Sequence, residues 1–347
     1  MKPKICTFFD QAIEMGASDL TLKPGAPPAF RLHGHLIHSE EEPLASQEMY
    51  DLFLPLIDAK KQICMRDRFD TFSMYPYKDK SRIRYYLFQQ REGFAGSFRF
   101  IPTKVPNIVD LGLPLDLEVQ ASKPRGLFLV TGPAGSGKTH TLAAMVNSIN
   151  RRFSRHIITM ECPIEFIYSP LQSIFTQIEV GTMIPTYQDA LTNALREDPD
   201  VMLIGEMKDR KTVEMALVAA ETGHMVFSTL PTLGAGASME RIVSFFPTDK
   251  HEEVRLQLSL NLVAIFSQIQ IPKISPQQTP NIAYELMIMN SAIRTLIRDK
   301  KYSQLPSAMV MSKREGCMTL KDSLTRLLRE ETTNQSVVKA MLQEIVE

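Results

Sequence analysis

Residues 126–150 read GLFLVTGPAGSGKTHTLAAMVNSIN, and the fold class is inferred outward from them. An apolar run at 126–132 enters a glycine-rich turn, and a stretch with helical character follows at 139–150. The turn at 132–139 matches the phosphate-loop pattern G-x-x-x-x-G-K-[ST], which requires a strand before it and a helix after it. Because both flanking elements are present, a chance glycine-rich turn is the weaker interpretation. The stretch therefore predicts a strand, loop and helix that bind the phosphates of a nucleoside triphosphate.

The loop supplies a complete set of candidate phosphate ligands. Its glycines allow backbone N–H groups to turn towards a phosphate, and the N-terminus of the next helix adds the positive end of a dipole. Lys138 is expected to reach the β- and γ-phosphates, and the Thr139 hydroxyl is expected to ligate Mg²⁺, so ATP and Mg²⁺ are the predicted cofactors. The predicted nucleotide-binding residues of the loop are Gly132, Pro133, Ala134, Gly135, Ser136, Gly137, Lys138 and Thr139.

The sequence beyond the loop alternates between apolar runs and helical stretches. Apolar runs occupy 156–161, 201–206 and 225–230, and helical stretches occupy 186–198 and 209–223. Thr and Asp open these two helices as N-caps, and a glycine ends the second. Continuous apolar strands that alternate with helices predict an α/β domain, a buried parallel sheet with helices on both faces. After about residue 245 the chain is predicted to be mainly helical.

The N-terminal third reads differently, as a mixed α/β domain. Residues 19–24 and 28–38 flank a turn rich in proline and glycine, which predicts a hairpin, and 82–90 and 96–102 predict a second strand pair. Four prolines and no sustained period follow, which predicts an interdomain linker. A length of 347 residues also favours two domains. The predicted divisions are an N-terminal domain at 1–100, a linker at 101–125 and an ATPase domain at 126–347 with a helical C-terminal part.

Composition excludes several classes of function. Lys and Arg number 39, as do Asp and Glu, so no global field favours nucleic acid or anionic lipid. The four cysteines are widely separated, which argues against a disulfide framework or a zinc knuckle and fits a reducing cytosol. The apolar run at 256–272 is interrupted by polar residues, so no membrane span is expected. A metal site at His33, His35 and His38 is disfavoured because no cysteine or carboxylate stands at ligand spacing.

Two glutamates stand where a hydrolytic site needs carboxylates. Hydrolysis of a triphosphate requires a carboxylate near Mg²⁺ and a group that orients the attacking water. Glu161 ends the run at 156–161, and Glu206 ends the run at 201–206. Parallel sheets bind ligands at the carboxyl ends of their strands, so both side chains are expected beside the loop. A surface carboxylate at a strand end is common, but two of them beside a phosphate loop favour a role in the site.

Five separated motifs resemble, in order, those of the secretion ATPases of type II secretion and type IV pili. The likeness is greatest to the pilus-retraction subfamily, through the segments at 16–34 and 291–309, and it runs almost end to end. The motifs are GPAGSGKT at 132–139, ITMECPIEF at 158–166, ALREDPDVMLIGEMKD at 194–209, AAETGHMVFSTL at 219–230 and ERIVSFFP at 240–247.

The resemblance implies a hexameric ATP-driven ring with a PAS-like N-domain and a RecA-like C-domain, and with the nucleotide between them. It implies that Arg84 and Arg99 of the N-domain complete the catalytic site. Glu206 matches the Walker B glutamate and is the expected general base, and Glu161 matches the acidic box and is expected to position water or Mg²⁺. Residues alone leave this division of roles open.

The same motifs imply roles for further residues of this chain. Arg196 and Arg241 match family arginines that sense nucleotide or hold the subunit interface, and His224 matches the first residue of the histidine box. The segment at 292–298 is either an ordinary amphipathic helix or, by the resemblance, a surface that faces the ring pore or a partner. Both interpretations stay open at this point.

Three positions depart from the family pattern. Cys162 stands where the acidic box has an aspartate, and a thiol is neutral near pH 7 where a carboxylate is charged. Pro231 replaces the second histidine of the histidine box, so the position has neither an imidazole nor an N–H to donate. Ile178 replaces an arginine. Nucleotide binding is expected to survive these changes, with slow turnover or dependence on a partner subunit.

Two functional hypotheses follow. The first is a motor that hydrolyses ATP to drive pilus retraction at the cytoplasmic face of the membrane, where it contacts an inner-membrane platform protein. Its assembly is expected to be a homo-hexamer, alone or mixed with a paralogous ATPase. The second is an accessory ATP-binding subunit of such a motor with weak turnover. A stand-alone kinase or GTPase and a DNA translocase are disfavoured, the last by the neutral charge balance.

Overall fold

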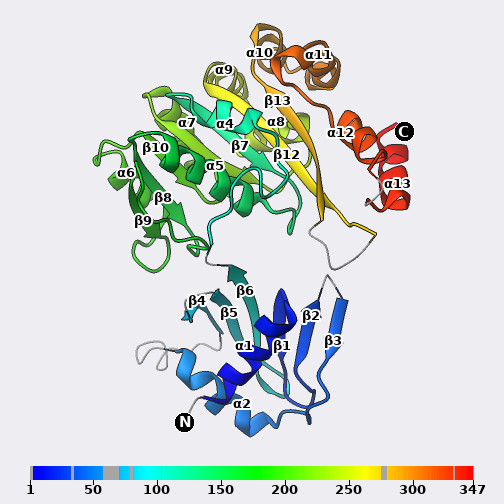
Figure 1. Cartoon of the computed structure of the whole chain (residues 1–347). Helices are drawn as coiled ribbons and strands as arrows, with labels where there is room; N and C mark the ends of the chain where they lie inside the picture. The colour runs from blue at the N-terminus through cyan, green and yellow to red at the C-terminus, as the bar shows by residue number, and fades with distance from the viewer. Residues whose placement is uncertain are drawn as a thin grey trace. The chain divides into compact units, whose positions relative to one another are not determined.

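The computed structural model describes residues 3–32, 35–57, 70–78, 81–102, 104–274, 280–330 and 333–346. The chain forms two compact units, Met1–Lys104 and Val105–Glu347 (Figure 1). Each unit contains its own buried apolar cluster.

The first unit is built on a six-stranded antiparallel sheet in the order β3-β2-β1-β6-β5-β4. Its strands are β1 (Asp19–Leu22), β2 (Ala29–Leu32), β3 (His35–His38), β4 (Asp70–Tyr77), β5 (Ser81–Gln90) and β6 (Gly93–Pro102). Its helices are α1 (Lys4–Met15), α2 (Ser46–Phe53) and the 3-10 turn η1 (Leu54–Leu56). Helix α1 buries residues three and four apart, which is the stripe expected of a helix on a sheet. From that stripe Phe9 meets Phe98 of β6 with ring centroids 5.3 Å apart.

The strand pairs predicted for this unit are present, with one refinement. Strand β1 pairs with β2, and β5 pairs with β6, as the sequence predicted. The stretch at 28–38 is not one strand, because β2 and β3 pair with each other across a reversal of direction. Residue His33 lies outside the described residues.

The second unit is built on a seven-stranded sheet in the order β13-β12-β7-β11-β10-β8-β9. All neighbours are parallel except β12 and β13. The strands are β7 (Gly126–Thr131), β8 (His156–Glu161), β9 (Ile174–Glu179), β10 (Val201–Ile204), β11 (Met225–Leu230), β12 (Leu262–Ile271) and β13 (Asn281–Ile288).

Helices connect these strands and cover the sheet. They are α4 (Asp116–Ala121), α5 (Lys138–Arg152), α6 (Tyr187–Ala194), α7 (Arg210–Glu221), α8 (Ala235–Ser244), α9 (His251–Asn261), α10 (Ser291–Arg298), α11 (Leu305–Met311), α12 (Leu320–Leu327) and α13 (Gln335–Val346), with 3-10 turns η2 (Thr248–Lys250), η3 (Tyr302–Gln304) and η4 (Lys313–Glu315). The predicted N-caps are confirmed, because the Thr186 side chain accepts from the Asp189 N–H and that of Asp209 accepts from the Thr212 N–H.

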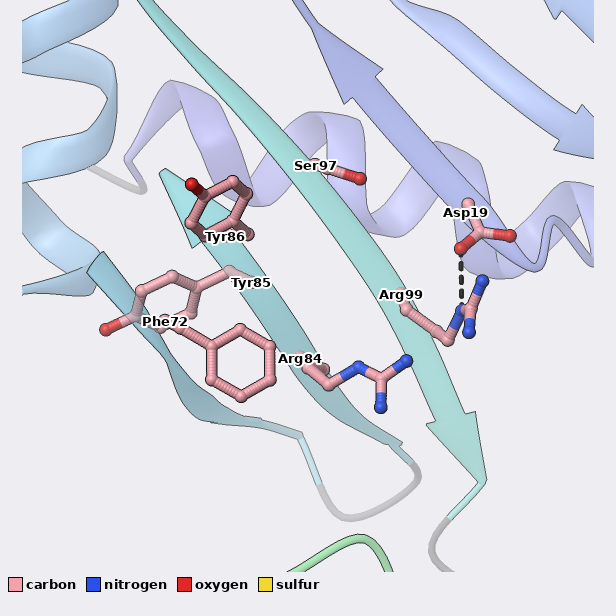
Figure 2. Close-up of a pocket in the computed structure, with 7 residues that line it drawn as sticks. All are labelled: Asp19, Phe72, Arg84, Tyr85, Tyr86, Ser97 and Arg99. Carbon is pink, nitrogen blue, oxygen red and sulfur yellow. Dashed lines mark hydrogen bonds and ion pairs between the residues drawn. The ribbon is translucent and has the colours of Figure 1, made fainter. Parts of the chain in front are cut away.

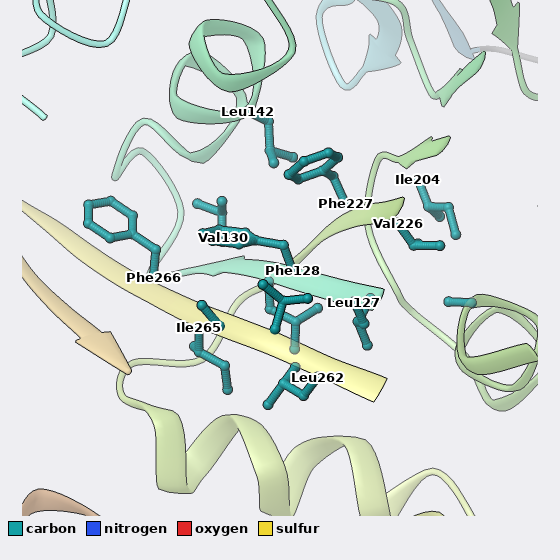
Figure 3. Close-up of a cluster of buried hydrophobic side chains, with 14 of the residues drawn as sticks. Leu127, Phe128, Val130, Leu142, Ile204, Val226, Phe227, Leu262, Ile265 and Phe266 are labelled. Atoms are coloured by element: carbon teal, nitrogen blue, oxygen red, sulfur yellow. The ribbon is translucent and has the colours of Figure 1, made fainter. Parts of the chain in front are cut away.

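The core of the second unit explains why its strands are apolar throughout. Every residue of β7, β10 and β11 is buried, as expected for a parallel sheet covered on both faces. Figure 3 shows side chains from β7, β11 and β12 gathered with Leu142 of α5. Phe128 and Phe227 lie side by side on neighbouring strands, with ring centroids 5.8 Å apart. The parallel α/β sheet predicted from the sequence is thus confirmed.

The structure refines two expectations from the sequence. Helices α9 to α13 form the helical C-terminal part, but β12 inserts beside β7 and β13 pairs with β12. The apolar run at 256–272 holds the end of a helix and a buried strand, and periodicity alone does not separate the two. Residues 105–125 are not a free linker, because Ile108, Leu113 and Leu117 are buried in the core of the second unit.

Candidate functional site

The phosphate loop joins the buried strand β7 to α5 at the carboxyl edge of the parallel strands. Gly132 has φ 144°, and a Cβ there would lie 2.2 Å from the Gln268 carbonyl oxygen, so no other residue fits. Gly135 has φ 79°, and a Cβ there would meet no atom of the described residues within 4 Å. The loop is therefore held tightly on the sheet side and open on the other, where a phosphate can approach the backbone.

Lys138 begins α5 and folds back over the loop. Its Nζ donates hydrogen bonds to the carbonyl oxygens of Gly132 at 2.8 Å and Pro133 at 3.0 Å. Burial lowers the pKa of Lys138, and the nearby Glu206 carboxylate opposes that shift. A half-buried cation over carbonyl oxygens is suited to an anionic ligand, which would offset the cost of its burial.

The loop also holds a polar atom that fits a bound phosphate. The Ser136 hydroxyl oxygen is buried and has no hydrogen-bond partner within the described part of the chain. Thr139 is the second residue of α5 and is half-buried, where a magnesium ligand of a phosphate loop is needed. The residues present therefore fit a nucleoside triphosphate with Mg²⁺.

The structure brings both predicted glutamates to the same edge as the loop. Glu161 is the last residue of β8 and is 6% exposed. Strands β8 and β10 are paired with Met160 opposite Ile204, so Glu206 follows β10 just beyond the level of Glu161. Glu206 forms an ion pair with Lys208 at 3.3 Å, and its effect on the pKa of Lys138 places it near the loop.

Tyr187 also lies at this edge, and no motif of the sequence pointed to it. A Cβ on Gly205 would lie 3.0 Å from the Tyr187 hydroxyl and 3.5 Å from the Met160 carbonyl oxygen, so the hydroxyl sits over the ends of β8 and β10. Burial raises the pKa of Tyr187, and the acidic groups of Cys162, Glu161 and Glu206 raise it further. The Thr186 cap predicted where α6 begins, but not that the first side chain of the helix lies over the ends of β8 and β10.

Gln268 of β12 is a second residue that the sequence analysis missed. Its Nε2 donates to the Ser136 carbonyl oxygen at 2.5 Å, and its Oε1 accepts from the Thr141 hydroxyl at 2.6 Å. The side chain is fully buried and ties the phosphate loop to the first turn of α5. The sequence did not point to Gln268 because the run around it was predicted to be helical.

Two predicted nucleotide-binding residues do not lie near the loop. Arg196 is an exposed residue that precedes β10, and His224 immediately precedes β11, where its Nδ1 contacts the Ala219 carbonyl oxygen at 2.9 Å. Both are at the amino ends of the parallel strands, and a six-residue strand such as β11 spans about 20 Å. The structure thus separates both residues from the loop of this chain, and their role in nucleotide sensing or at a subunit interface stays a prediction. Arg241 lies on an exposed part of α8 and stacks on Phe245, with its guanidinium 4.5 Å from the ring centroid.

The two predicted N-domain arginines lie together. Arg84 of β5 and Arg99 of β6 are directly opposite in the antiparallel ladder. They line a pocket of about 300 Å³ together with Asp19, Phe72 and Tyr86, among others (Figure 2). The Arg99 Nε donates to the Asp19 carboxylate at 2.8 Å. The first unit therefore concentrates cationic and aromatic groups on one face of its sheet.

The three departures occupy different surroundings. Cys162 follows β8 with an exposed thiol, and Pro231 follows β11 in an exposed position. Ile178 of β9 is partly buried against the core, where an arginine would place a charge. Cys162 and Pro231 thus flank the carboxyl edge that carries the loop and the glutamates.

The segment at 292–298 forms most of α10, and its first arginine has a structural role. The Arg294 Nη1 donates to the carbonyl oxygens of Ser259 and of Leu260, the latter at 2.9 Å, and so caps the C-terminus of α9. Burial lowers the pKa of Arg294. The contacts of Arg294 therefore support the interpretation of the segment as an ordinary amphipathic helix.

The described residues hold neither a metal-binding cluster nor a membrane-spanning helix. No three His, Cys, Asp or Glu side chains in those ranges gather into a cluster that could hold a metal ion. No described helix has the length and apolarity to cross a lipid bilayer.

Comparison with known proteins identifies the family. Residues 112–344 match the family model described as "Type II/IV secretion system protein". The type IV pilus retraction ATPase PilT of Pseudomonas aeruginosa is 39% identical over 307 residues, which cover 88% of this chain and 89% of that protein. The type IV pilus ATPase PilU of the same organism is 33% identical over 316 residues, 91% of this chain and 82% of PilU.

A solved structure extends the likeness to the whole fold. The crystal structure of the pilus retraction motor PilT with bound ADP superposes with a TM-score of 0.87 at 39% identity, and covers 97% of this chain and 96% of that chain. The chain therefore belongs to the type II/IV secretion system protein family and is a PilT/PilU-like secretion ATPase.

Proposed function

We propose that this chain hydrolyses ATP to power type IV pilus retraction, that is, the removal of pilin subunits from the pilus. The observation that carries the proposal is the joint placement of Lys138, Glu161 and Glu206 at one sheet edge. It is supported by 39% identity to a pilus retraction ATPase over most of both chains.

The residues of the second unit divide the work of binding and hydrolysis. The loop N–H groups and Lys138 hold the β- and γ-phosphates, and Thr139 holds Mg²⁺. When bound, the metal neutralises charge on the phosphate oxygens. Glu206 accepts a proton from the attacking water as general base, and Glu161 orients that water.

Two residues of the first unit contribute charge in this proposal. Arg84 and Arg99 stabilise the negative charge that develops on the transferring phosphoryl group. Arginines that act in this way are worth about 10³–10⁵ in rate. Their pairing across β5 and β6 supports a joint role, since both guanidinium groups line one pocket.

The assembly is proposed from the family. The chain forms a hexamer, alone or with a paralogous ATPase, and works at the cytoplasmic face of the membrane against an inner-membrane platform protein. Arg241, exposed on α8, contributes to the subunit interface in this proposal.

A second candidate function is favoured by two positions at the site. Pro231 and Cys162 flank the glutamates, and neither offers the charge or the donor of the family pattern. Loss of one well-placed donor costs about 10²–10³ in rate. The alternative is therefore an accessory subunit that binds ATP in a mixed ring and turns over slowly alone.

Steady-state ATP hydrolysis by the purified chain distinguishes the two, with Lys138→Ala as background and the mass measured by light scattering. Turnover well above background, with a loss of about 10²–10⁴-fold in Glu206→Gln, supports the motor. Background turnover with ATP still bound supports the accessory subunit, and activity should then return when a full-motif partner is added. Failure to bind ATP would refute both.

A further inference from the structure

Tyr187 places a phenol hydroxyl among the acidic groups of the site. The residue opens α6, where the Thr186 cap fixes the start of the helix by accepting from the Asp189 N–H at 3.1 Å. From there the side chain crosses the carboxyl ends of β8 and β10, and its hydroxyl comes within 3.0 Å of the Cβ position of Gly205. Gly205 lies between β10 and Glu206, so any larger residue there would displace the hydroxyl.

The chemistry of Glu161, Glu206 and Cys162 defines what the hydroxyl of Tyr187 can do. A carboxylate accepts hydrogen bonds but donates none, whereas a phenol can donate one. Burial, Cys162 and both glutamates all raise the pKa of Tyr187, so the hydroxyl keeps its proton at neutral pH. It is thus a hydrogen-bond donor at the strand ends that carry the two glutamates.

A purely structural role would not need the oxygen. The ring packs against the core of the second unit, and a phenylalanine would fill the same space. The oxygen gives this position a hydrogen-bond donor that a phenylalanine would lack. The carboxylates carried by the strand ends beneath it are the acceptors for that donor in the proposal below.

We propose that the Tyr187 hydroxyl is a positioning group for hydrolysis, which donates into the space between Glu161 and Glu206 and holds these carboxylates in the arrangement that orients the attacking water. The inference rests on the proposed ATPase function. It also assigns a donor to a site whose histidine-box position is Pro231.

The first test compares Tyr187→Phe with Tyr302→Phe. The control removes a buried hydroxyl of the same unit that has no hydrogen-bond partner among the described residues. A hydrogen bond to a charged group predicts a fall in kcat of about 10- to 100-fold for Tyr187→Phe. The KM and the dissociation constant for ATP should stay within about twofold, because the hydroxyl acts through the glutamates and not on the bound nucleotide.

Two results of this test would overturn the proposal. An unchanged kcat would show that the hydroxyl does nothing, and a matching loss of ATP affinity would show a binding role. If the unsubstituted chain turns over no faster than Lys138→Ala, the proposed function has failed, and Tyr187 is judged by the second test alone.

The second test needs neither nucleotide nor turnover. Fluorotyrosine is incorporated throughout, and the fluorine resonance of Tyr187 is identified by its absence in Tyr187→Phe. The resonance should shift in Glu206→Gln and in Glu161→Gln. It should not shift in Glu214→Gln, which changes an exposed carboxylate of α7 paired with Arg210. A resonance that shifts in neither Glu206→Gln nor Glu161→Gln would refute the contact between Tyr187 and these glutamates.

Discussion

At the scale of single residues, the site combines intact and altered positions on one sheet edge. Lys138, Glu161 and Glu206 lie where binding and hydrolysis need them, while Pro231 follows β11 in an exposed position. A proline at this point breaks no hydrogen bond of the strand, because the strand has ended. The substitution therefore changes the chemistry of the site and leaves its frame in place.

Pro231→His should raise turnover. An imidazole at the end of β11 returns a donor near the phosphates, and a well-placed donor is worth about 10²–10³ in rate. We expect kcat to rise by at least about 10-fold, since part of that gain depends on placement. Steady-state ATP hydrolysis and thermal unfolding would measure the effect and the stability.

The matched control is Pro124→His, an exposed proline two residues before β7 at the opposite end of the strands. It should leave kcat unchanged. A Pro231→His variant that folds normally and is no faster than the unsubstituted chain would contradict the expected role of this position.

At the scale of elements, β12 holds the loops of the site in place. Gln268 holds the phosphate loop, while the neighbouring Ser267 hydroxyl accepts from the Gly234 N–H at 2.7 Å, in the loop that follows Pro231. Two consecutive residues of one strand thus fix the two loops that flank the predicted phosphate position. The placement of β12 beside β7 gives the loop its shape before any ligand binds.

Gln268→Met should weaken nucleotide binding. The substitution keeps the volume but leaves the Ser136 carbonyl oxygen and the Thr141 hydroxyl without their partner, at a cost of about 1–3 kcal/mol each. We expect the affinity for ATP, measured by calorimetric titration, to fall about 10-fold or more. A tenfold change in a dissociation constant corresponds to about 1.4 kcal/mol. Gln304→Met, on an exposed turn, is the control. Equal affinities in the two variants would refute the bracing role.

Glu285 of β13 joins two helices to the sheet. Its carboxylate accepts the N–H of Ala235 at 2.7 Å, at the start of α8, and the N–H of Leu320, at the start of α12. Burial raises its pKa, and these two hydrogen bonds only partly offset that shift. The charged form is therefore less favourable in the folded chain than in the unfolded chain.

The pH dependence of stability follows from the sign of that shift. Because its pKa is raised, Glu285 holds its proton more tightly in the folded chain than in the unfolded chain. Its contribution to the free energy of unfolding is therefore fully present below the unfolded pKa of about 4.5. That contribution is lost as the pH rises through the folded pKa. Glu285→Gln removes the titration, so its free energy of unfolding should fall less over this window than that of the unsubstituted chain. Urea unfolding between about pH 5 and pH 8 measures the slopes. Glu214→Gln serves as the exposed control, and parallel slopes for Glu285→Gln and the unsubstituted chain would contradict the argument.

At the scale of the whole molecule, the boundary between the units lies earlier than the apolar pattern of β7 suggests. The second unit begins at Val105, and residues before β7 contribute Ile108, Leu113 and Leu117 to its core. Each such side chain contributes about 1.5–3 kcal/mol when buried. The segment at 105–125 is therefore part of the folding unit.

A fragment of residues 105–347 should fold and bind ATP by itself, whereas a fragment of residues 126–347 should be less stable by several kcal/mol, about the worth of three buried aliphatic side chains. Without Arg84 and Arg99, the longer fragment should also lose turnover of about 10³-fold or more. Urea unfolding, ATP titration and hydrolysis assays of both fragments test this. Equal stability of the two fragments would contradict the assignment of 105–125 to the core.

The parallel sheet, the phosphate loop and the edge on which Glu161 and Glu206 lie could be predicted from the sequence. These features depend on the local alternation of apolar strands and helices and on the rule that ligands bind at the carboxyl ends of parallel strands. The same rule argues against Arg196 and His224, which precede their strands, but motif likeness alone had grouped them with the site.

Other features of the site became visible only in the folded chain. The tertiary structure placed β12 beside β7, so that Gln268 reaches Thr141 across 127 residues of sequence, and it directed Tyr187 over the ends of β8 and β10. It also packed residues 105–125 into the second core. Local periodicity fixes which segments become strands and helices, whereas contacts between distant segments depend on the path of the whole chain, which no short stretch of sequence encodes.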